Sequence, residues 1–514
     1  MVLLENTNYP LRGLPYILYA PAPPEGHMQP AIQICTYLVD QGFDVTLMGS
    51  PRWKQAVESS GMNFASLVGV VEDTTSNKVH NMPTDIMTMP LAPLLGADFA
   101  LRFARLMVKS WDVLRFALIG MANRLGLKTL RSRGIVILSD TAFPGVLPLK
   151  LGAYMPPGFQ EIQIKTLGIG VVPRFWATPY HPPWGLGLPY DASDMGVART
   201  LRAHDEQKAL HRQKGGEDKV RMMLDIYDCN ISIESLFHGY QTFCSGDGDA
   251  VISHTFLDAI TVCNDTTLQM STESLDFPMP PGAKKEYVPS HLKHAGFLPR
   301  KSIPSDLRYP SWFHELTMPE RQSLSCSPKV VLVAQGTQTN NYDEVVIPTI
   351  QALTGETAIL VVAILCHRGA HLDLSSFKDG VLPPNVRVLD YFPYDAILPY
   401  VEVFVSSSGF GGLSHAIANG VPMVQCGWIV DKPDIGRRVE CSGLGLYIGR
   451  DDYPAKPEAI RCAVKTILNS QGIYKRRAEN LCRESKMLYR PLECIREEIM
   501  ALHGDSMMVG GGLK

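Results

Sequence analysis

The chain has 514 residues, of which 45% are hydrophobic and 19% charged, and its formal net charge is −3. This length suggests two or three domains, and the composition excludes a disordered chain. The small net charge gives no reason to expect nucleic acid or an anionic membrane surface as a partner. Eleven cysteines without a CxxC pair favour reduced thiols, and hence a cytoplasmic protein, over a disulfide framework.

The first fifty residues predict a βαβ unit, and the N-terminal sequence lacks the pattern of a signal peptide. Residues 16–20 indicate a strand, PAPPEGHMQP a loop, and apolar residues at helical spacing follow Pro30. Residues 43–48 indicate the next strand. Such a unit favours a parallel sheet, to which residues 135–138 add a further strand.

Two segments separate this unit from the rest of the chain. Residues 81–131 are expected to be mostly helical and to pack on the sheet. Residues 166–191 are too rich in Pro and Gly for regular structure, and their aromatic side chains suit the wall of an apolar acceptor pocket. Ordinary loop packing explains each of these aromatic residues as well. The residues assigned to acceptor binding are Phe175, Trp176, Tyr180 and Trp184.

The second half of the chain again alternates strands with helices. We predict a domain over 1–300, a linker broken by prolines over 301–327, a domain over 328–505 and a flexible tail over 506–514. The expected strands of the second domain are KVVLVA, AILVVAI, VRVLDY, VEVFV, PMVQCG and LGLYIG. Two such α/β halves would place a ligand cleft between the C-terminal edges of both sheets.

The stretch from 403 to 430 contains no Asp, Glu, Lys or Arg and is long enough to span a bilayer. Its glycines, the serines at 406–408 and Pro422 argue against a spanning helix, because they break the helix and would leave polar groups in lipid. The pattern predicts instead a strand, a small-residue turn, a short helix from about Gly411 and a second strand.

A histidine and an aspartate follow predicted strands of the first half. His27 stands where α/β folds place functional groups, and it can act as a general base near neutral pH. A structural histidine is an equal alternative. Asp140 ends a later strand, where its carboxylate could fix the tautomer of the imidazole or cap the following turn.

The turn SSSGFGG precedes a predicted helix N-terminus, whose free N–H groups and dipole can bind phosphate. The loop AQGTQTNN at 334–341 could contact the same phosphate. The turn does not match the GxGxxG fingerprint of dinucleotide-binding oxidoreductases, because Ser414 occupies the third glycine position. Asp431 could accept hydrogen bonds from sugar hydroxyls and Lys432 could donate one, unless the two are only a helix cap and a solvated lysine. No cluster has metal-ligand spacing.

Together these motifs resemble the family 1, UDP-dependent glycosyltransferases of the GT-B fold, in particular fungal members related to sterol, glycolipid and secondary-metabolite glucosyltransferases. The resemblance rests on GHMQP, the Asp after a strand, QGT, VRVLDYFPYDAILP, SSSGFGG followed by GVP, and DKPDIGRRVE, in this order. It implies an α/β protein with two Rossmann-like parallel-sheet domains that face each other across a cleft, and a C-terminal helix that crosses back to the first domain.

The resemblance also implies an inverting hexosyltransferase. His27 would deprotonate the acceptor hydroxyl with Asp140 as its partner, and Tyr391, with Phe392, would replace the aromatic residue that stacks on uracil. No metal or other cofactor is expected, because helix and hydrogen-bond donors stabilise the leaving group. The donor-binding residues so implied are Gly336, Thr337, Tyr391, Phe392, Ser407, Ser408, Gly409, Gly411, Gly412, His415, Asp431 and Lys432.

The chain departs from the family at three positions. Ser407 stands where the family commonly has histidine, His415 replaces the acidic residue that often binds the ribose, and Lys432 replaces a frequent glutamine. We expect donor preference to be decided at Ser407 and His415.

The leading hypothesis is transfer of glucose from UDP-glucose to a lipophilic hydroxyl compound such as a terpenoid, polyketide or phenolic. The expected partners are therefore a nucleotide sugar and a small-molecule acceptor, without nucleic acid or a transmembrane anchor. One alternative is a sterol or membrane-glycolipid glycosyltransferase with peripheral membrane contact. An alternative of another class is an inactive, donor-binding partner protein. A nicotinamide oxidoreductase is disfavoured by the missing third glycine.

Overall fold

The computed structural model describes residues 13–67, 97–212, 216–240, 242–245, 248–281, 283, 287–317, 327–337, 340–428, 430–449 and 454–509. Helices α5 (Ala97–Leu125) and α6 (Leu127–Arg133) confirm most of the helical prediction for 81–131. The part of that prediction before residue 97 lies outside the described residues.

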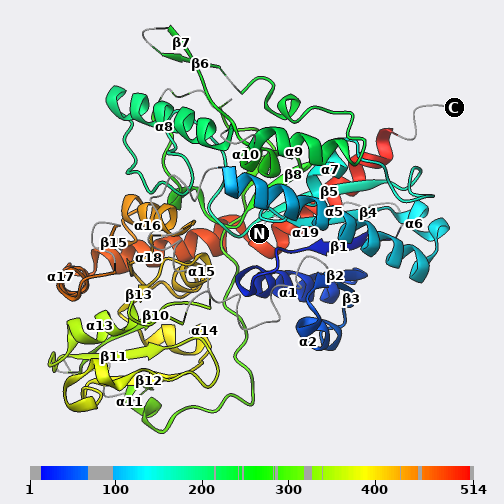
Figure 1. Ribbon diagram of the computed structural model, residues 1–514. Helices are drawn as coiled ribbons and strands as arrows, with labels where there is room; N and C mark the ends of the chain where they lie inside the picture. The colour runs from blue at the N-terminus through cyan, green and yellow to red at the C-terminus, as the bar shows by residue number, and fades with distance from the viewer. Residues whose placement is uncertain are drawn as a thin grey trace, which may run out of the picture.

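A seven-stranded parallel sheet forms the first half of the protein (Figure 1). Its strands, in spatial order, are β3 (Asn63–Ser66), β2 (Val45–Gly49), β1 (Tyr16–Ala20), β4 (Ile135–Asp140), β5 (Ile164–Gly170), β8 (Thr266–Gln269) and β9 (Leu292–His294). The interior strand β1 is buried along its whole length and pairs Tyr16 with Ile135 of β4 on one side and Ile17 with Val45 of β2 on the other. The strands predicted at 16–20, 43–48 and 135–138 are therefore confirmed.

Strand β5 corrects the prediction that residues 166–191 lack regular structure. The glycines that suggested a loop allow a neighbouring strand to approach closely, since a Cβ added at Gly168 would lie 2.6 Å from the hydroxyl of Thr267 on β8. From Val171 to Ser193 the segment has no helix or strand, as predicted.

Helices cover both faces of this sheet. Helix α1 (Glu25–Asp40) packs on one face and α5 on the other, so alternate residues of β1 enter different cores. Helix α1 starts at Glu25, earlier than predicted. Pro24 is the N-cap residue, without a side-chain hydrogen bond, and Pro30 lies inside the helix rather than at its start. His27 therefore lies in the first helical turn rather than in a loop. The remaining elements are α2 (Lys54–Ser59), α7 (Val146–Lys150), α8 (Asp194–Arg212), α9 (Gly216–Asp225), α10 (Phe256–Val262) and an antiparallel hairpin of β6 (Thr242–Ser245) and β7 (Gly248–Val251).

A six-stranded parallel sheet forms the second half, and it contains the six strands predicted there. In spatial order these are β12 (Val386–Leu389), β11 (Ile359–Ile364), β10 (Lys329–Ala334), β13 (Val403–Ser406), β14 (Met423–Gln425) and β15 (Gly445–Tyr447). The helices are α11 (His314–Thr317), α13 (Val346–Leu353), α14 (Tyr394–Ile397), α15 (Phe410–Asn419), α16 (Lys432–Cys441), α17 (Pro457–Leu468), α18 (Ile473–Glu484) and α19 (Pro491–Val509).

The uncharged stretch 403–430 folds as β13, α15 and β14, as its small residues predicted. In the described part of the chain, no helix combines the length and apolar character that a membrane crossing requires.

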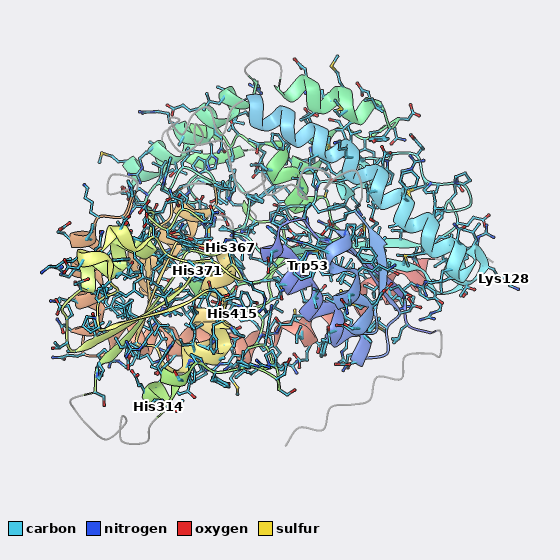
Figure 2. All side chains as sticks on the ribbon, turned by 60° about the horizontal axis from the view of Figure 1, so that its bottom comes forward. Trp53, Lys128, His314, His367, His371 and His415 are labelled. Atoms are coloured by element: carbon cyan, nitrogen blue, oxygen red, sulfur yellow. The ribbon has the colours of Figure 1, made fainter. Side chains whose placement is uncertain are left out.

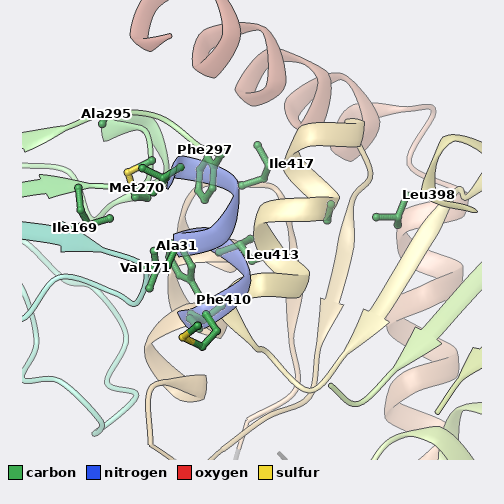
Figure 3. Packing of buried hydrophobic residues seen from close by; sticks show 14 of the residues in the cluster. Ala31, Ile169, Val171, Met270, Ala295, Phe297, Leu398, Phe410, Leu413 and Ile417 are labelled. Carbon is green, nitrogen blue, oxygen red and sulfur yellow. The ribbon is translucent and has the colours of Figure 1, made fainter. Parts of the chain in front are cut away.

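One hydrophobic core joins the two halves. It extends from the α1 face of the first sheet, through α1 and α15, to one face of the second sheet. Figure 3 shows α1 between strands of the first half and α15 of the second, and the rings of Phe297 and Phe410 lie 6.0 Å apart at this junction. The two domains are thus packed against each other, while their boundaries at 300 and 328 stay a prediction.

Helix α19 crosses back to the first half, as predicted, and contacts α1, β4 and β5 (Figure 1). It continues to Val509, so the tail predicted from residue 506 is helical at its start, and residues 510–514 lie outside the described part.

A buried carboxylate adds a charged contact between the halves. Asp276 of the first half accepts a hydrogen bond from Nε of Arg438 on α16 at 2.8 Å, and its second oxygen lies 3.1 Å from Arg174. Burial raises the pKa of Asp276, but the two guanidinium groups outweigh burial and hold its pKa well below the usual range. The carboxylate is therefore ionised and paired at neutral pH.

Replacing Asp276 with alanine should leave two largely buried arginines without their shared carboxylate. We expect the free energy of unfolding, measured by urea denaturation at neutral pH, to fall by about 3–5 kcal/mol, as for other broken buried ion pairs. Glu440→Ala is the control, because it removes a half-exposed partner of Arg437 on the same helix and should cost less than about 0.5 kcal/mol. A loss below about 1 kcal/mol for Asp276→Ala would contradict the assignment.

Candidate active site

The centre of the site is a pair formed by His27 and Asp140. Asp140 is fully buried at the end of β4, and its Oδ2 lies 2.7 Å from Nδ1 of His27. The backbone N–H of Ala142 donates to the other carboxylate oxygen at 2.7 Å. With both oxygens engaged, Asp140 fixes the imidazole, and Nε2 is the ring nitrogen left to act on a substrate. The turn cap and the dyad partner, predicted as alternatives for Asp140, thus occur together.

The electrostatic surroundings favour protonation of His27. Burial lowers the pKa of His27, but the negative charge and hydrogen bond of Asp140, together with the charge of Asp431, outweigh burial and raise its pKa. Asp431 belongs to the second half, so the pKa of His27 depends on charges from both halves.

The N-terminus of α15 is open at the carboxyl edge of the second sheet. Gly409 precedes the helix and has no side chain with which to cap it, so the residue before the helix leaves the first N–H groups uncapped. A Cβ added at Gly409 or Gly411 would meet no atom within 4 Å, as would one at Gly336 after β10. These three predicted donor-site glycines therefore border open space, whereas Gly412 faces the ring of Phe404.

Two serines tie the surrounding loops together. The hydroxyl of Ser407 donates to the carbonyl of Gln335 at 2.6 Å, next to Gly336 and Thr337, and is therefore not free to bind a phosphate. The hydroxyl of Ser408 accepts a hydrogen bond from the N–H of Gly427 at 3.0 Å. The hydroxyls of both residues thus bind neighbouring loops and do not line the turn as free groups.

The backbone is strained at this same edge of the sheet. Cys366 after β11, Ser408 after β13 and Val430 after β14 all have positive φ values, of 64°, 62° and 59°. Such conformations are unfavourable for residues with a side chain and tend to occur at functional sites.

The two candidates for stacking on a nucleobase differ in exposure: one ring is buried and the other is partly exposed. Phe392 is buried against Phe313 of the linker region, with ring centroids 5.6 Å apart, so it packs in the core. Tyr391 is 37% exposed, and the guanidinium of Arg368 lies 4.4 Å from its ring centroid. Arg368 also lines a cavity of about 630 Å³ together with His367 and His371, both labelled in Figure 2. This volume is in the range of small-molecule sites.

The remaining donor-site candidates lie on helix α15 and at the start of helix α16. His415 is 24% exposed, and its Nδ1 lies 3.0 Å from the carboxylate of Asp395. Asp431 immediately precedes α16 without capping it through its side chain. Burial raises the pKa of Asp431, although the positive charge of Lys432 opposes this effect. Burial lowers the pKa of Lys432, although the negative charge of Asp431 opposes it. Both side chains are half-buried.

The aromatic residues at 175–184 pack mainly against other residues and line little open space. Phe175 and Trp176 are 7% and 5% exposed, and Nε1 of Trp176 donates to the carbonyl of Tyr287 at 2.7 Å. The structure thus favours the loop-packing alternative for these two residues. Tyr180 and Trp184 are half-buried and stay predicted acceptor contacts. The following residues contact α16, where Gly185 N–H donates to Asp434 at 2.5 Å.

Sequence reasoning missed two residues beside the site. Arg368 lies four residues after the predicted strand AILVVAI, at the edge where the site was expected, and this position could have identified it. Asp395 lies in a four-residue helix and is 20 positions from His415, so no spacing in the sequence connects the two. Among the described residues, no group of three or more His, Cys, Asp or Glu side chains has metal-binding geometry.

Comparisons with known proteins show sequence relatives of the chain and solved structures with the same fold. The erythromycin biosynthesis protein CIII-like C-terminal domain matches residues 367–502. UDP-glucosyltransferase 1 of Beauveria bassiana is 27% identical over 482 residues, which cover 93% of each chain. UDP-glucosyltransferase A1 of Starmerella bombicola is 29% identical over 471 residues, which cover 90% of this chain and 87% of that one.

Solved structures share the two-domain architecture. The calicheamicin glycosyltransferase superimposes with a TM-score of 0.60 at 16% identity, covering 96% of this chain and 99% of that one. The glycotransferase of kitacinnamycin gives 0.58 at 19% identity, covering 94% and 98%. The predicted fold and family resemblance are confirmed: the chain is a glycosyltransferase of the GT-B fold, homologous along most of its length to fungal UDP-glucosyltransferases.

Proposed function

We propose that this glycosyltransferase moves glucose from UDP-glucose to a hydroxyl of a lipophilic small molecule, with inversion at the anomeric carbon. The observation that carries the proposal is the 2.7 Å contact between His27 and Asp140, in reach of the charge of Asp431 from the other half. A general base paired with a buried carboxylate, beside an open helix N-terminus, is the arrangement that such a transfer requires.

In the proposed reaction, Nε2 of His27 takes the proton of the acceptor hydroxyl as the acceptor oxygen attacks the anomeric carbon. The bond between that carbon and the diphosphate oxygen breaks on the opposite face, and UDP leaves with the electron pair. An α-linked donor therefore gives a β-glycoside. Asp140 holds the imidazole in one tautomer and stabilises the imidazolium that forms.

The leaving diphosphate would lie at the N-terminus of α15. The uncapped N–H groups and the helix dipole attract negative charge there, and the open space at Gly409 and Gly411 admits it. These donors stabilise the charge that develops on the leaving group, so the proposal includes no metal. Asp431 would accept hydrogen bonds from hydroxyls of the transferred sugar, and Lys432 would donate one.

The lipophilic acceptor is proposed from the half-buried aromatic side chains of Tyr180 and Trp184. Two solved structures with the same fold are named for glycosylation of calicheamicin and kitacinnamycin, and a third was solved with spinosyn aglycone. These names describe those proteins, and we extend only the class of acceptor to this chain.

The first test is a transfer assay with UDP-glucose and a panel of hydroxylated hydrophobic compounds, followed by mass spectrometry and NMR of the product. We expect a β-glucoside. His27→Ala should lower kcat by about 100- to 10,000-fold, the usual contribution of a general base. Its Kd for UDP should change less than about twofold, because His27 does not contact the proposed diphosphate site. Full turnover by His27→Ala, or an α-linked product, would refute the mechanism, and UDP binding without any transfer would favour the inactive partner.

The second test separates donor binding from folding. Gly411→Ala should stabilise the protein slightly, by up to about 1 kcal/mol, because alanine is the better helix former. Its new methyl group would occupy space assigned to the diphosphate, so we expect Kd for UDP, measured by calorimetry, to rise at least about tenfold.

Gly120→Ala is the matched control. Gly120 lies inside α5, and a Cβ there also meets no atom within 4 Å. This variant should show the same gain in stability and unchanged UDP binding. Unchanged UDP affinity in Gly411→Ala would contradict the proposal that the diphosphate binds at the N-terminus of α15.

A further inference from the structure

A glycine-rich segment of the first half, residues 184–187, lies against helix α16 of the second half. The backbone N–H of Gly185 donates to Oδ2 of Asp434 at 2.5 Å, and Nε of Arg437 donates to the carbonyl of Gly187 at 2.9 Å. Asp434 is 2% exposed, so its carboxyl group is closed off from solvent in this arrangement. The two hydrogen bonds fasten a loop of one half to a helix of the other.

The glycines of the 184–187 segment allow this close approach. Gly185 and Gly187 have φ values of 83° and 60°, which favour glycine. A Cβ added at Gly187 would lie 2.5 Å from Cβ of Pro433, so a side chain at this position would push the segment off the helix. The sequence WGLGLP thus has glycine where the contact with α16 requires it.

The same segment carries Trp184, one of the predicted acceptor contacts. The carbonyl of Trp184 accepts from Gln207 on α8 at 2.9 Å, and its ring meets that of Phe175 edge-on at 4.8 Å. The next residue, Gly185, is bonded to α16, which lies on the side of the second half that faces α8 (Figure 1). Trp184 is therefore fixed from both halves.

Helix α16 links this segment to the proposed donor site. Its first residue is Lys432, which together with the preceding Asp431 is proposed to bind the transferred sugar. Asp434 and Arg437 are three residues apart, so their side chains lie on one face of the helix. One short helix thus carries the proposed sugar contacts at its start and the contacts with the 184–187 segment within its first two turns.

We propose that Asp434 is a positioning residue that docks the 184–187 segment onto α16 and thereby holds Trp184 in place for the acceptor. This inference rests on the proposed function, in which Tyr180 and Trp184 contact the acceptor. Asp434 touches neither substrate, because its carboxyl group is buried against Gly185. Loss of the docking should therefore weaken acceptor binding and leave donor binding unchanged.

The charge of Asp434 affects the strength of this docking. Burial raises the pKa of Asp434 to about 7, although the charge of Arg438 and the hydrogen bond from Gly185 oppose this effect. Asp431 on the same helix adds to the rise, and Tyr447 of β15 is the further ionisable group that faces Asp434. The docked segment itself, with the sequence WGLG, contributes no ionisable side chain.

The direction of the pH effect follows from the two states of the segment. When the segment is undocked, water reaches Asp434, and an aspartate in water has a pKa of about 3.9. The docked state therefore binds the proton more tightly than the undocked state. Docking is strongest below about pH 4, weakens as the pH rises to about 7, and changes little above that pH.

The first experiment measures amide hydrogen exchange of the 184–187 segment by mass spectrometry, on the full chain without ligand. Asp434→Ala removes the acceptor for the N–H of Gly185, and Gly187→Ala places a methyl group against Pro433. Both variants should raise the exchange rate of the segment at least about fivefold. Asp434→Asn keeps an oxygen that can accept from Gly185, so its segment should exchange like that of the wild type.

The pH dependence of the same exchange tests the role of the charge. After correction for intrinsic exchange, protection of the segment in the wild type should fall with rising pH up to about 7. In Asp434→Asn, whose amide does not ionise, protection should stay constant over this range.

The second experiment measures initial rates of transfer from UDP-glucose to naphthol, or to the panel compound that the wild type glucosylates fastest. In Asp434→Ala and Gly187→Ala, KM for the acceptor should rise about threefold to tenfold, the effect of one lost hydrogen bond. The kcat and the Kd for UDP should change less than about twofold. Asp434→Asn should restore the wild-type KM.

Two variants serve as matched controls. Gly239 also has a positive φ, of 88°, but a Cβ there would meet no atom within 4 Å, so Gly239→Ala adds backbone strain without a clash. Asp265 directly precedes β8, at the edge of the first sheet opposite to the site, and is bonded to Thr166 and Lys150. Gly239→Ala and Asp265→Ala should lower the melting temperature and leave KM for the acceptor unchanged.

Unchanged exchange in both Asp434→Ala and Gly187→Ala would overturn the docking. Faster exchange with an unchanged KM for the acceptor, or an equal rise of KM in the controls, would overturn the positioning role. A KM in Asp434→Asn as high as that in Asp434→Ala would overturn the role of the hydrogen bond from Gly185. Absence of transfer by the wild type would instead refute the proposed function, and the exchange rates would still decide whether the segment docks.

Discussion

Parallel pairing of the strands in both main sheets is the constraint on which the site depends. Each parallel connection must return to the starting edge through a helix or loop, so every strand ends at the same edge of its sheet. His27 follows β1 and Asp140 ends β4, which brings residues 113 positions apart to 2.7 Å. In the second sheet, β13 and β14 lead in the same way to α15 and to Asp431. A shared hydrophobic core and a buried ion pair then hold the two halves together.

The proposed site combines a buried charge with an uncharged segment that would bind phosphate. The stretch 403–430 needs no lysine or arginine, because the N-terminus of α15 provides positive potential from backbone N–H groups. Its serines serve the loops, since Ser407 binds the carbonyl of Gln335 and Ser408 the N–H of Gly427. In the proposed function, backbone groups therefore bind the diphosphate, and Ser407 and His415 are positions at which the chain departs from the family pattern.

Much of this could be predicted from the sequence, for physical reasons that also explain the failures. Buried parallel strands are continuous apolar runs, so KVVLVA and its neighbours were predictable. Strand β8, with sequence TTLQ, resembles a loop because its polar side chains are satisfied by the backbone carbonyls of Thr261 and Gly170, the second of which is 99 positions away. Pro30 suggested a helix start that lies earlier, at Glu25. The pairing of His27 with Asp140 follows from topology, but that of His415 with Asp395 depends on tertiary packing that no spacing records.

The pH dependence of kcat/KM tests the central claim, the pairing of His27 with Asp140, most directly. His27 must be neutral to accept a proton, and its raised pKa places the midpoint of the acidic limb above about 6.5, the ordinary value for histidine. In Asp140→Asn the charge that raises this pKa is gone while burial still lowers it, so the account predicts a slower enzyme whose midpoint lies at lower pH. An unchanged midpoint in Asp140→Asn would contradict it.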